Sequence, residues 1–135
     1  MTQEMYEVMT ERFAKDSLIA LATVEGDTPH VRTVNGYYMD GAFYCVTHAR
    51  SGKMHQIGKN NRVAICGEWF TGHGLAESLG HVLAQENCDL MDVLRPAFGS
   101  WYSLGHVDES DPDTILLKIT LTSGVLMKHG KRFEF

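Results

Sequence analysis

Apolar residues recur every three or four positions in two parts of the chain, which is the spacing of helices with one buried face. Near the start these residues are Met5, Val8, Met9 and Phe13. Thr2 stands where the N-cap of this first helix would lie. A second apolar stripe consists of Leu90, Met91, Leu94, Phe98, Trp101 and Tyr102. We expect this second helix to kink or restart at Pro96, because proline lacks the backbone donor that a helix interior needs.

Elsewhere, β-branched and aromatic residues form short runs bounded by turn residues, which is typical of strands. The predicted strands cover residues 17–24, 30–39, 42–47, 62–70, 75–79, 115–121 and 125–128. Asp40-Gly41 indicates a tight hairpin, and Ser123-Gly124 indicates another turn. A short helix is predicted over residues 52–59. Six or seven mostly antiparallel strands with two or three helices favour a single mainly β domain over residues 1–135, a β-barrel with helical decoration.

Composition narrows the choice of function without naming one. The chain has 135 residues, 44% hydrophobic residues and a net charge of −5. Because Lys and Arg form no cluster, we expect no nucleic-acid partner. The first fifteen residues lack the pattern of a signal peptide, and no apolar run is long enough to span a membrane, so a cytoplasmic protein is expected. The three cysteines form no CxxC pair and no two of the seven histidines are spaced i, i+4, so no metal site is expected.

The segment from Thr47 to Lys53 carries the clearest candidate chemistry. It follows a predicted strand and opens a predicted helix, whose first N–H groups and partial positive charge suit a phosphate. Ser51 offers a hydroxyl group, Gly52 permits close approach, and Arg50 and Lys53 supply charge. The alternative is an ordinary strand-to-helix connection in which Ser51 is only the N-cap, and by itself this local pattern favours that alternative.

The preceding strand adds weight to the phosphate interpretation. Arg32-Thr33-Val34-Asn35 is predicted to pair, through the Asp40-Gly41 hairpin, with residues 42–47. At about 3.3 Å of rise per residue, Arg32 then lies near the end of the hairpin where the Thr47 segment begins. Cationic and hydroxyl side chains from both segments would converge on one anion. A solvent-exposed Arg32 without a ligand remains the alternative.

In order and spacing these residues resemble the pyridoxamine 5′-phosphate oxidase-like family of FMN-binding split barrels. That family carries Arg-x-Val on its second strand, Thr-x-x-x-Ser-x-Lys after its third, and an Asn-x-Arg-Val-type start to its fourth. The matching residues here are Arg32-Thr33-Val34, Thr47, Ser51, Lys53 and Asn61-Arg62-Val63. The resemblance covers about residues 17–127 and looks closest to the short bacterial members, which include general-stress and nitroimidazole-resistance proteins.

The resemblance implies a split β-barrel of six or seven strands that binds FMN at the interface of a homodimer. Its phosphate would be held by Arg32, Ser51 and Lys53, and its isoalloxazine ring bordered by backbone groups of Thr33, Val34 and Asn35 and of Val46 and Thr47. Many members have Arg where this chain has Gly52, and Arg50 is the candidate replacement. Trp69, Trp101 and Tyr102 are the aromatic candidates for a contribution from the partner subunit, and packing in the core is the favoured alternative for each. His48 lies in the phosphate loop, within reach of flavin or substrate.

The function expected from this resemblance is a flavin-dependent oxidoreductase that passes electrons from a reduced nicotinamide to a small acceptor. The chain lacks the Arg-x-His segment that ends the full-length oxidase, so oxidation of pyridoxamine 5′-phosphate itself is not expected. The alternatives are a non-catalytic flavin carrier or redox sensor, a related barrel that binds deazaflavin or haem, and a barrel that lost its phosphate site through Gly52.

Overall fold

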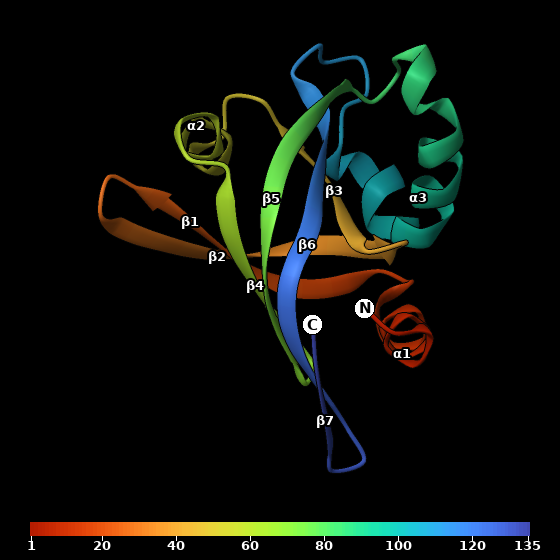
Figure 1. The fold of residues 1–135 in the computed structure, drawn as a ribbon. Helices are drawn as coiled ribbons and strands as arrows, with labels where there is room; N and C mark the ends of the chain where they lie inside the picture. Colours follow the sequence, from red (N-terminus) through yellow and green to blue (C-terminus); the bar gives the residue numbers. More distant parts are fainter.

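Seven antiparallel strands form one sheet in the order β3-β2-β1-β4-β5-β6-β7, and an additional pairing of β3 with β6 closes the first six into a barrel (Figure 1). This computed structural model describes residues 1–135, the side chain of Ser100 excepted. The strands are β1 (Ser17–Glu25), β2 (Thr28–Met39), β3 (Ala42–His48), β4 (Arg62–Gly67), β5 (Phe70–His81), β6 (Thr114–Lys128) and β7 (Lys131–Glu134). The predicted fold class, a mainly β split barrel, is confirmed.

Three α-helices decorate this barrel. They are α1 (Gln3–Phe13), α2 (Gly52–Lys59) and α3 (Cys88–Trp101), with short helical segments η1 (Gln85–Asn87) before and η2 (Tyr102–His106) after α3. The predicted N-cap is confirmed, because the Thr2 hydroxyl accepts a hydrogen bond from the Met5 amide. No described helix is long and apolar enough to cross a membrane.

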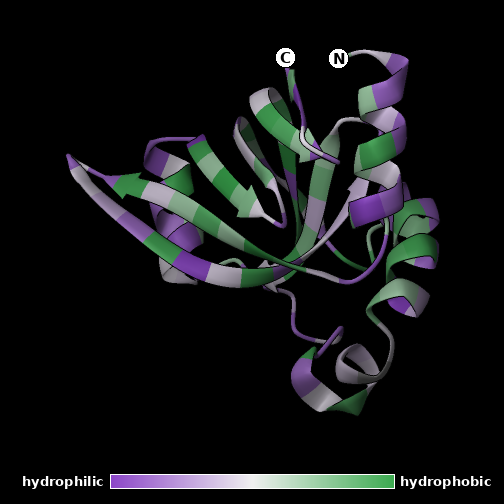
Figure 2. Cartoon of the chain, turned by 90° about the horizontal axis from the view of Figure 1, so that it is seen from below, coloured by the Kyte–Doolittle hydropathy of each residue, from purple (hydrophilic) through white to green (hydrophobic). Residues whose placement is uncertain are grey.

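The core follows from the alternation of side chains along the strands, which Figure 2 shows as alternating hydrophobic and hydrophilic bands. One apolar cluster fills the barrel and reaches the buried face of α1; Ile19, Leu21, Tyr38, Phe43, Phe70 and Phe13 belong to it. A second cluster lies between α3 and the outer side of β3 and β6; Tyr44, Leu94, Phe98, Tyr102 and Leu116 belong to it. The barrel and α3 therefore form one continuous body around β3 and β6.

The barrel is split between β2 and β3. These strands pair only next to their hairpin, from Met39↔Ala42 to Tyr37↔Tyr44. Beyond that point β2 stays paired with β1 as far as Thr28↔Glu25, whereas β3 pairs with β6 along its whole length. The predicted pairing of residues 32–35 with residues 42–47 is therefore wrong: β3 follows β6 and leaves the neighbouring edge of β2 open.

Several predicted elements differ from the structure, among them the strand expected over residues 62–70, which ends at Gly67 before β5 begins at Phe70. The strand expected over residues 75–79 is the twelve-residue β5, and the two strands expected on either side of Ser123-Gly124 are the single fifteen-residue β6. The chain therefore does not turn at Ser123-Gly124. It turns at His129-Gly130, between β6 and β7, where both residues have a positive φ. The second helix continues past Pro96 and departs from helical geometry at Gly99 (φ 56°, ψ −133°).

Candidate functional site

The guanidinium of Arg32 is held in a fixed place by neutral acceptors. Its Nη1 lies 2.7 Å from Thr23 Oγ1 and 3.3 Å from the Leu21 carbonyl oxygen, and its Nη2 lies 2.9 Å from Gln56 Oε1. Thr23 and Gln56 are buried and bonded to each other. Partial burial lowers the pKa of Arg32. Among the described residues no carboxylate forms a hydrogen bond or ion pair with this guanidinium. Glu25 Oε2 accepts from Gln56 Nε2 at 3.4 Å and lies 3.9 Å from His30 Nε2.

A second half-buried cation, Lys53, stands on α2 one turn before the Gln56 that accepts from Arg32. Lys53 stands in the first turn of α2, and burial lowers the pKa of its ammonium group, which the nearby charge of Arg32 lowers further. Within the described part of the chain, Lys53 has neither a hydrogen bond nor an ion pair to a carboxylate. The structure thus brings two predicted phosphate ligands together without a protein counter-charge.

The start of α2 completes this corner of the molecule. Ser51 is the N-cap of α2, and its Oγ accepts from the Met54 amide at 3.4 Å. Gly52 follows, and a Cβ added to it would meet no other atom within 4 Å. The first turn of α2 contains no acidic residue. We call Arg32, Ser51, Gly52 and Lys53 the cation corner.

Arg50 lies outside the cation corner. Its Nε is 2.8 Å from Asp113 Oδ2, in the loop before β6, and 81% of its side chain is exposed. The structure therefore pairs Arg50 with an acid of this chain, whereas the sequence predicted it as a further phosphate ligand.

The predicted ring-binding segments border the split. On one side, Thr33, Val34 and Asn35 pair with β1. Their other edge has no strand partner, because β3 pairs with β2 only from Tyr37 to Met39. Val46 and Thr47 pair with β6 at Leu116 and Ile115, and their other edge faces the same opening. Along these two segments, backbone N–H and C=O groups are therefore available to a ligand that enters the split.

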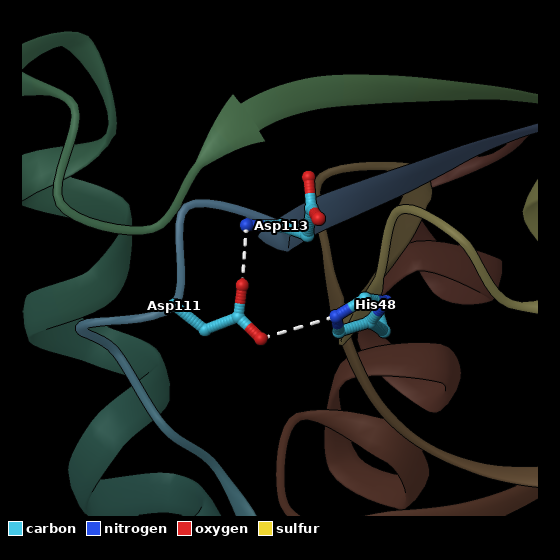
Figure 3. Close-up of side chains that lie close together, drawn as sticks. All are labelled: His48, Asp111 and Asp113. Atoms are coloured by element: carbon cyan, nitrogen blue, oxygen red, sulfur yellow. Dashed lines mark hydrogen bonds and ion pairs between the residues drawn. The ribbon is translucent and has the colours of Figure 1, made fainter.

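His48 belongs to a polar cluster that fastens the β3–α2 loop to the loop before β6 (Figure 3). His48 Nε2 lies 3.1 Å from Asp111 Oδ2, while Asp111 Oδ1 accepts from the Asp113 amide at 2.8 Å. The hydrogen bond from the Asp113 amide, together with the contact with His48, lowers the pKa of Asp111. His48 Nδ1 accepts from the Arg50 amide at 3.2 Å, so the neutral ring carries its proton on Nε2. A metal ion needs that same nitrogen unprotonated, so the geometry favours a structural fastening over a metal site.

The three aromatic candidates lie in different places. The Trp101 indole donates to Asp16 Oδ2 at 2.9 Å, and Tyr102 is buried with its hydroxyl bonded to Glu109. Burial and the Glu109 contact raise the pKa of Tyr102. Trp69 is 70% exposed in the β4–β5 turn. The first two therefore pack against the barrel, and only Trp69 projects from it.

Sequence reasoning missed Thr23, Gln56 and Asp16, the residues that hold Arg32, Asn35 and Trp101. Thr23 and Gln56 occur in a strand and an amphipathic helix where a polar residue usually faces solvent, so their positions along the chain gave no signal.

No family model matches the chain, and no curated protein is similar to it in sequence. Solved structures do match over nearly its whole length. General stress protein 26 from Bacillus anthracis str. Sterne is 20% identical, with a TM-score of 0.74, over 98% of this chain and 100% of that chain. A Clostridium acetobutylicum protein related to general stress protein 26, of the pyridoxinephosphate oxidase family, is 20% identical, with a TM-score of 0.64, over 98% of this chain and 91% of that chain.

A third match is a FAD-binding protein from Mesorhizobium loti, 13% identical, with a TM-score of 0.66, over 92% of each chain. The agreement extends over the barrel and its helices rather than a single motif. This chain therefore has the split-barrel fold of pyridoxinephosphate oxidase-like proteins.

Proposed function

We propose that this chain is an FMN-binding flavoprotein of the cytoplasm that passes electrons from a reduced nicotinamide to a small-molecule acceptor. The observation that carries the proposal is the cation corner, where neither Arg32 nor Lys53 pairs with a carboxylate of the residues that the structure describes. Keeping two partly buried like charges side by side destabilises the free protein. An external dianion such as the FMN phosphate would offset that cost.

The residues present fit such a group. Arg32 offers a planar guanidinium held by Thr23 and Gln56, so little side-chain freedom is lost when a phosphate binds. The first amides of α2 add backbone donors to Lys53 and the Ser51 hydroxyl. The open space at Gly52 leaves the helix start uncovered.

The ring would lie along the split. Backbone groups of Thr33, Val34 and Asn35 on one strand, and of Val46 and Thr47 on the other, would hydrogen-bond its polar edge. When bound, the flavin supplies the electron-transfer chemistry. This chain would bind the phosphate, orient the ring and exclude water from one of its faces. The FAD-binding protein of the same fold supports a flavin as the ligand.

A second copy of this chain is the proposed partner. The outer face of β2, β1 and β4 carries small and apolar side chains in adjacent rows, since Ala22 pairs with Val31 and Ala64, and Ala20 with Cys66. Leu18 and Val31 on this face are 69% and 70% exposed. An uncovered apolar sheet face of this kind is typical of an interface. The second copy would cover this face and close the split over the flavin.

The test is the visible spectrum of purified protein before and after addition of FMN and gel filtration. We expect retained flavin bands that are lost in Arg32→Ala and Lys53→Ala. Lys59→Ala, at the exposed end of the same helix, is the matched control and should retain them. A wild-type protein that retains no FMN would contradict the proposal. Retention of FMN without turnover of NADH or NADPH would indicate a flavin carrier or sensor instead of an enzyme.

A further inference from the structure

The buried side chain of Gln56 separates an arginine from a carboxylate, at the place where α2 contacts β1 and β2 (Figure 1). Its Oε1 accepts from Arg32 Nη2 at 2.9 Å and also from the Thr23 hydroxyl. Its Nε2 donates to Glu25 Oε2 at 3.4 Å. The same carboxylate oxygen lies 3.9 Å from His30 Nε2.

The two ends of the Gln56 amide cannot be exchanged. An arginine only donates hydrogen bonds, and an ionised carboxylate only accepts them. The amide oxygen must therefore face Arg32, and the amide nitrogen must face Glu25. A neutral side chain that both accepts and donates fits this position, whereas a carboxylate would pair with the arginine directly.

Glu25 lies close enough to replace Gln56 as the partner of Arg32. Side chains alternate along a strand, so Thr23 and Glu25 share one face of β1. Thr23 pairs with His30, which places His30 and Arg32 on the same face of β2. The guanidinium reaches Thr23 Oγ1 at 2.7 Å, and Glu25 is two residues further along β1, about 7 Å away. Without the Gln56 side chain, the flexible Glu25 side chain can span that gap.

The same contacts decide which donors of Arg32 stay free. A guanidinium has five N–H groups. Nη1 donates to Thr23 and to the Leu21 carbonyl oxygen, and Nη2 donates once, to Gln56. The N–H of Nε and the second N–H of Nη2 have no partner among the described residues. These two lie on one edge of the guanidinium, the fork that binds two oxygens of a phosphate.

We infer that Gln56 is a positioning residue of the phosphate site: it keeps Glu25 from pairing with Arg32 and thereby leaves the Nε–Nη2 edge of the guanidinium to two oxygens of a phosphate monoester. The inference rests on the proposed function, in which that monoester is the phosphate of FMN. Gln56 itself touches no ligand and acts through Arg32. Its effect should therefore be confined to ligands that carry the phosphate.

Rescue by a second substitution tests the inference. In Gln56→Ala, FMN binding should weaken by about tenfold, the scale of one lost charge-assisted contact. The affinity for riboflavin, which lacks the phosphate, should stay the same. Adding Glu25→Gln to Gln56→Ala should restore most of the FMN affinity, because no carboxylate is then left to pair with Arg32. In an otherwise wild-type chain Glu25→Gln should have a much smaller effect. Gln85→Ala, an exposed glutamine, is the matched control.

Gln56→Glu provides a second variant that leaves no cavity. It has nearly the same size and places a carboxylate directly on Arg32, so at pH 8 it should also weaken FMN binding by about tenfold. Gln85→Glu adds the same charge at an exposed position and should bind FMN like the wild type. Circular dichroism should establish that each variant is folded.

The outcomes separate this inference from the proposed function. Wild-type FMN affinity in a folded Gln56→Ala or Gln56→Glu would overturn the inference and leave the proposed function intact. An equal loss of FMN and riboflavin affinity, or a loss in Gln56→Ala that Glu25→Gln does not restore, would also overturn it, because Gln56 would then only support the fold. A wild type that retains no FMN would overturn both.

Discussion

Lys53 illustrates a conflict between stability and binding at a single residue. Its ammonium group is half-buried next to Arg32, and its lowered pKa records both the burial and the neighbouring charge. In the free protein this arrangement disfavours the folded state, whereas with an anion bound it becomes attractive. Variants at this position should therefore separate the two properties.

We predict that Lys53→Met stabilises the protein without ligand while it weakens FMN binding. Methionine has a similar length and removes the uncompensated charge, so the melting temperature should rise and FMN affinity should fall at least about tenfold. Thermal denaturation with and without FMN checks both effects. Lys59→Met, at the exposed end of α2, should change neither. A Lys53→Met protein that melts below the wild type would show that Lys53 has a stabilising partner.

Gly52 offers the opposite experiment. A side chain at this position meets open space, and the residue lies at the start of α2 beside Lys53. We predict that Gly52→Arg tightens FMN binding by about threefold to tenfold, because it adds a third cation to the cation corner. Gly58→Arg, also in open space on α2 but nearer its end, is the matched control. Equal gains in both variants would mean that only net charge matters.

On the scale of elements, β3 carries a buried thiol that links stability to pH. Cys45 is 1% exposed, and burial raises its pKa from the ordinary 9.0 to about 12. Above about pH 9 the unfolded chain therefore loses a proton that the folded chain keeps. The free energy of unfolding should fall as pH rises through this window, by up to ~1.4 kcal/mol per pH unit.

Urea denaturation at pH 8 and pH 10 measures this loss. It should be smaller in Cys45→Ala, which lacks the thiol, and unchanged in Cys66→Ala, which alters an exposed cysteine. The pKa of Tyr38 is raised to about 12 by burial and acts in the same direction, but from an ordinary value of 10.0, so it contributes little at pH 10. The same pH dependence in all three proteins would exclude Cys45 as its source.

The β4–β5 turn contains an unfavourable residue. Trp69 has a φ of 54°, in the left-handed region that bulky side chains rarely adopt, and its ring is mostly exposed. We predict that Trp69→Asn stabilises the protein by about 1 kcal/mol, because asparagine tolerates this conformation. Trp69→Ala keeps a Cβ and should give no such gain. Denaturation of both variants in urea decides, and equal stabilities would contradict the prediction.

The glycines of β5 and β6 explain where the sequence misled. Runs of apolar, β-branched and aromatic residues predicted β1, β3 and much of β6, but Gly72 and Gly74 lay outside every predicted strand and Gly124 was predicted as a turn residue. They are required by close contacts: a Cβ at Gly74 would lie 2.7 Å from the Thr120 carbonyl oxygen, and one at Gly124 would lie 2.8 Å from the rings of Phe70 and Phe135. These contacts join residues that are far apart in the sequence, so no local sequence pattern reveals them.

The cation corner was partly predictable. Arg32, Ser51 and Lys53 were predicted as phosphate ligands from the helix start after β3 and from the charges near it, and their role in binding stays a prediction. The role of Arg50 was not, since its partner Asp113 lies more than sixty residues along the chain. The split itself also escaped, because hairpin rules describe how β2 and β3 start to pair but not which strand β3 follows afterwards.

For the whole molecule, the proposed dimer gives a direct prediction. Ala22→Glu places a charge between Val31 and Ala64, at the centre of the outer sheet face. We expect this variant to be monomeric and the wild type and Gln85→Arg to be dimeric in sedimentation equilibrium, because a buried unpaired charge at an interface is strongly unfavourable. Circular dichroism should confirm that the variant is folded. A monomeric wild type would contradict the dimer.

The closing ladder between β3 and β6 also has a consequence for the order of events during synthesis. Ala42 pairs with Thr120, so the barrel cannot close until most of the chain has left the ribosome. Pairing between residues so distant in sequence makes folding slow, on the order of milliseconds to seconds. The residues of the cation corner are all synthesised early. The strand that leads to Ser51, β3, nevertheless pairs along its whole length only with β6, which is synthesised late. A nascent chain that ends before β6 should therefore expose an unpaired strand, and capture of the cofactor should be a late step of folding.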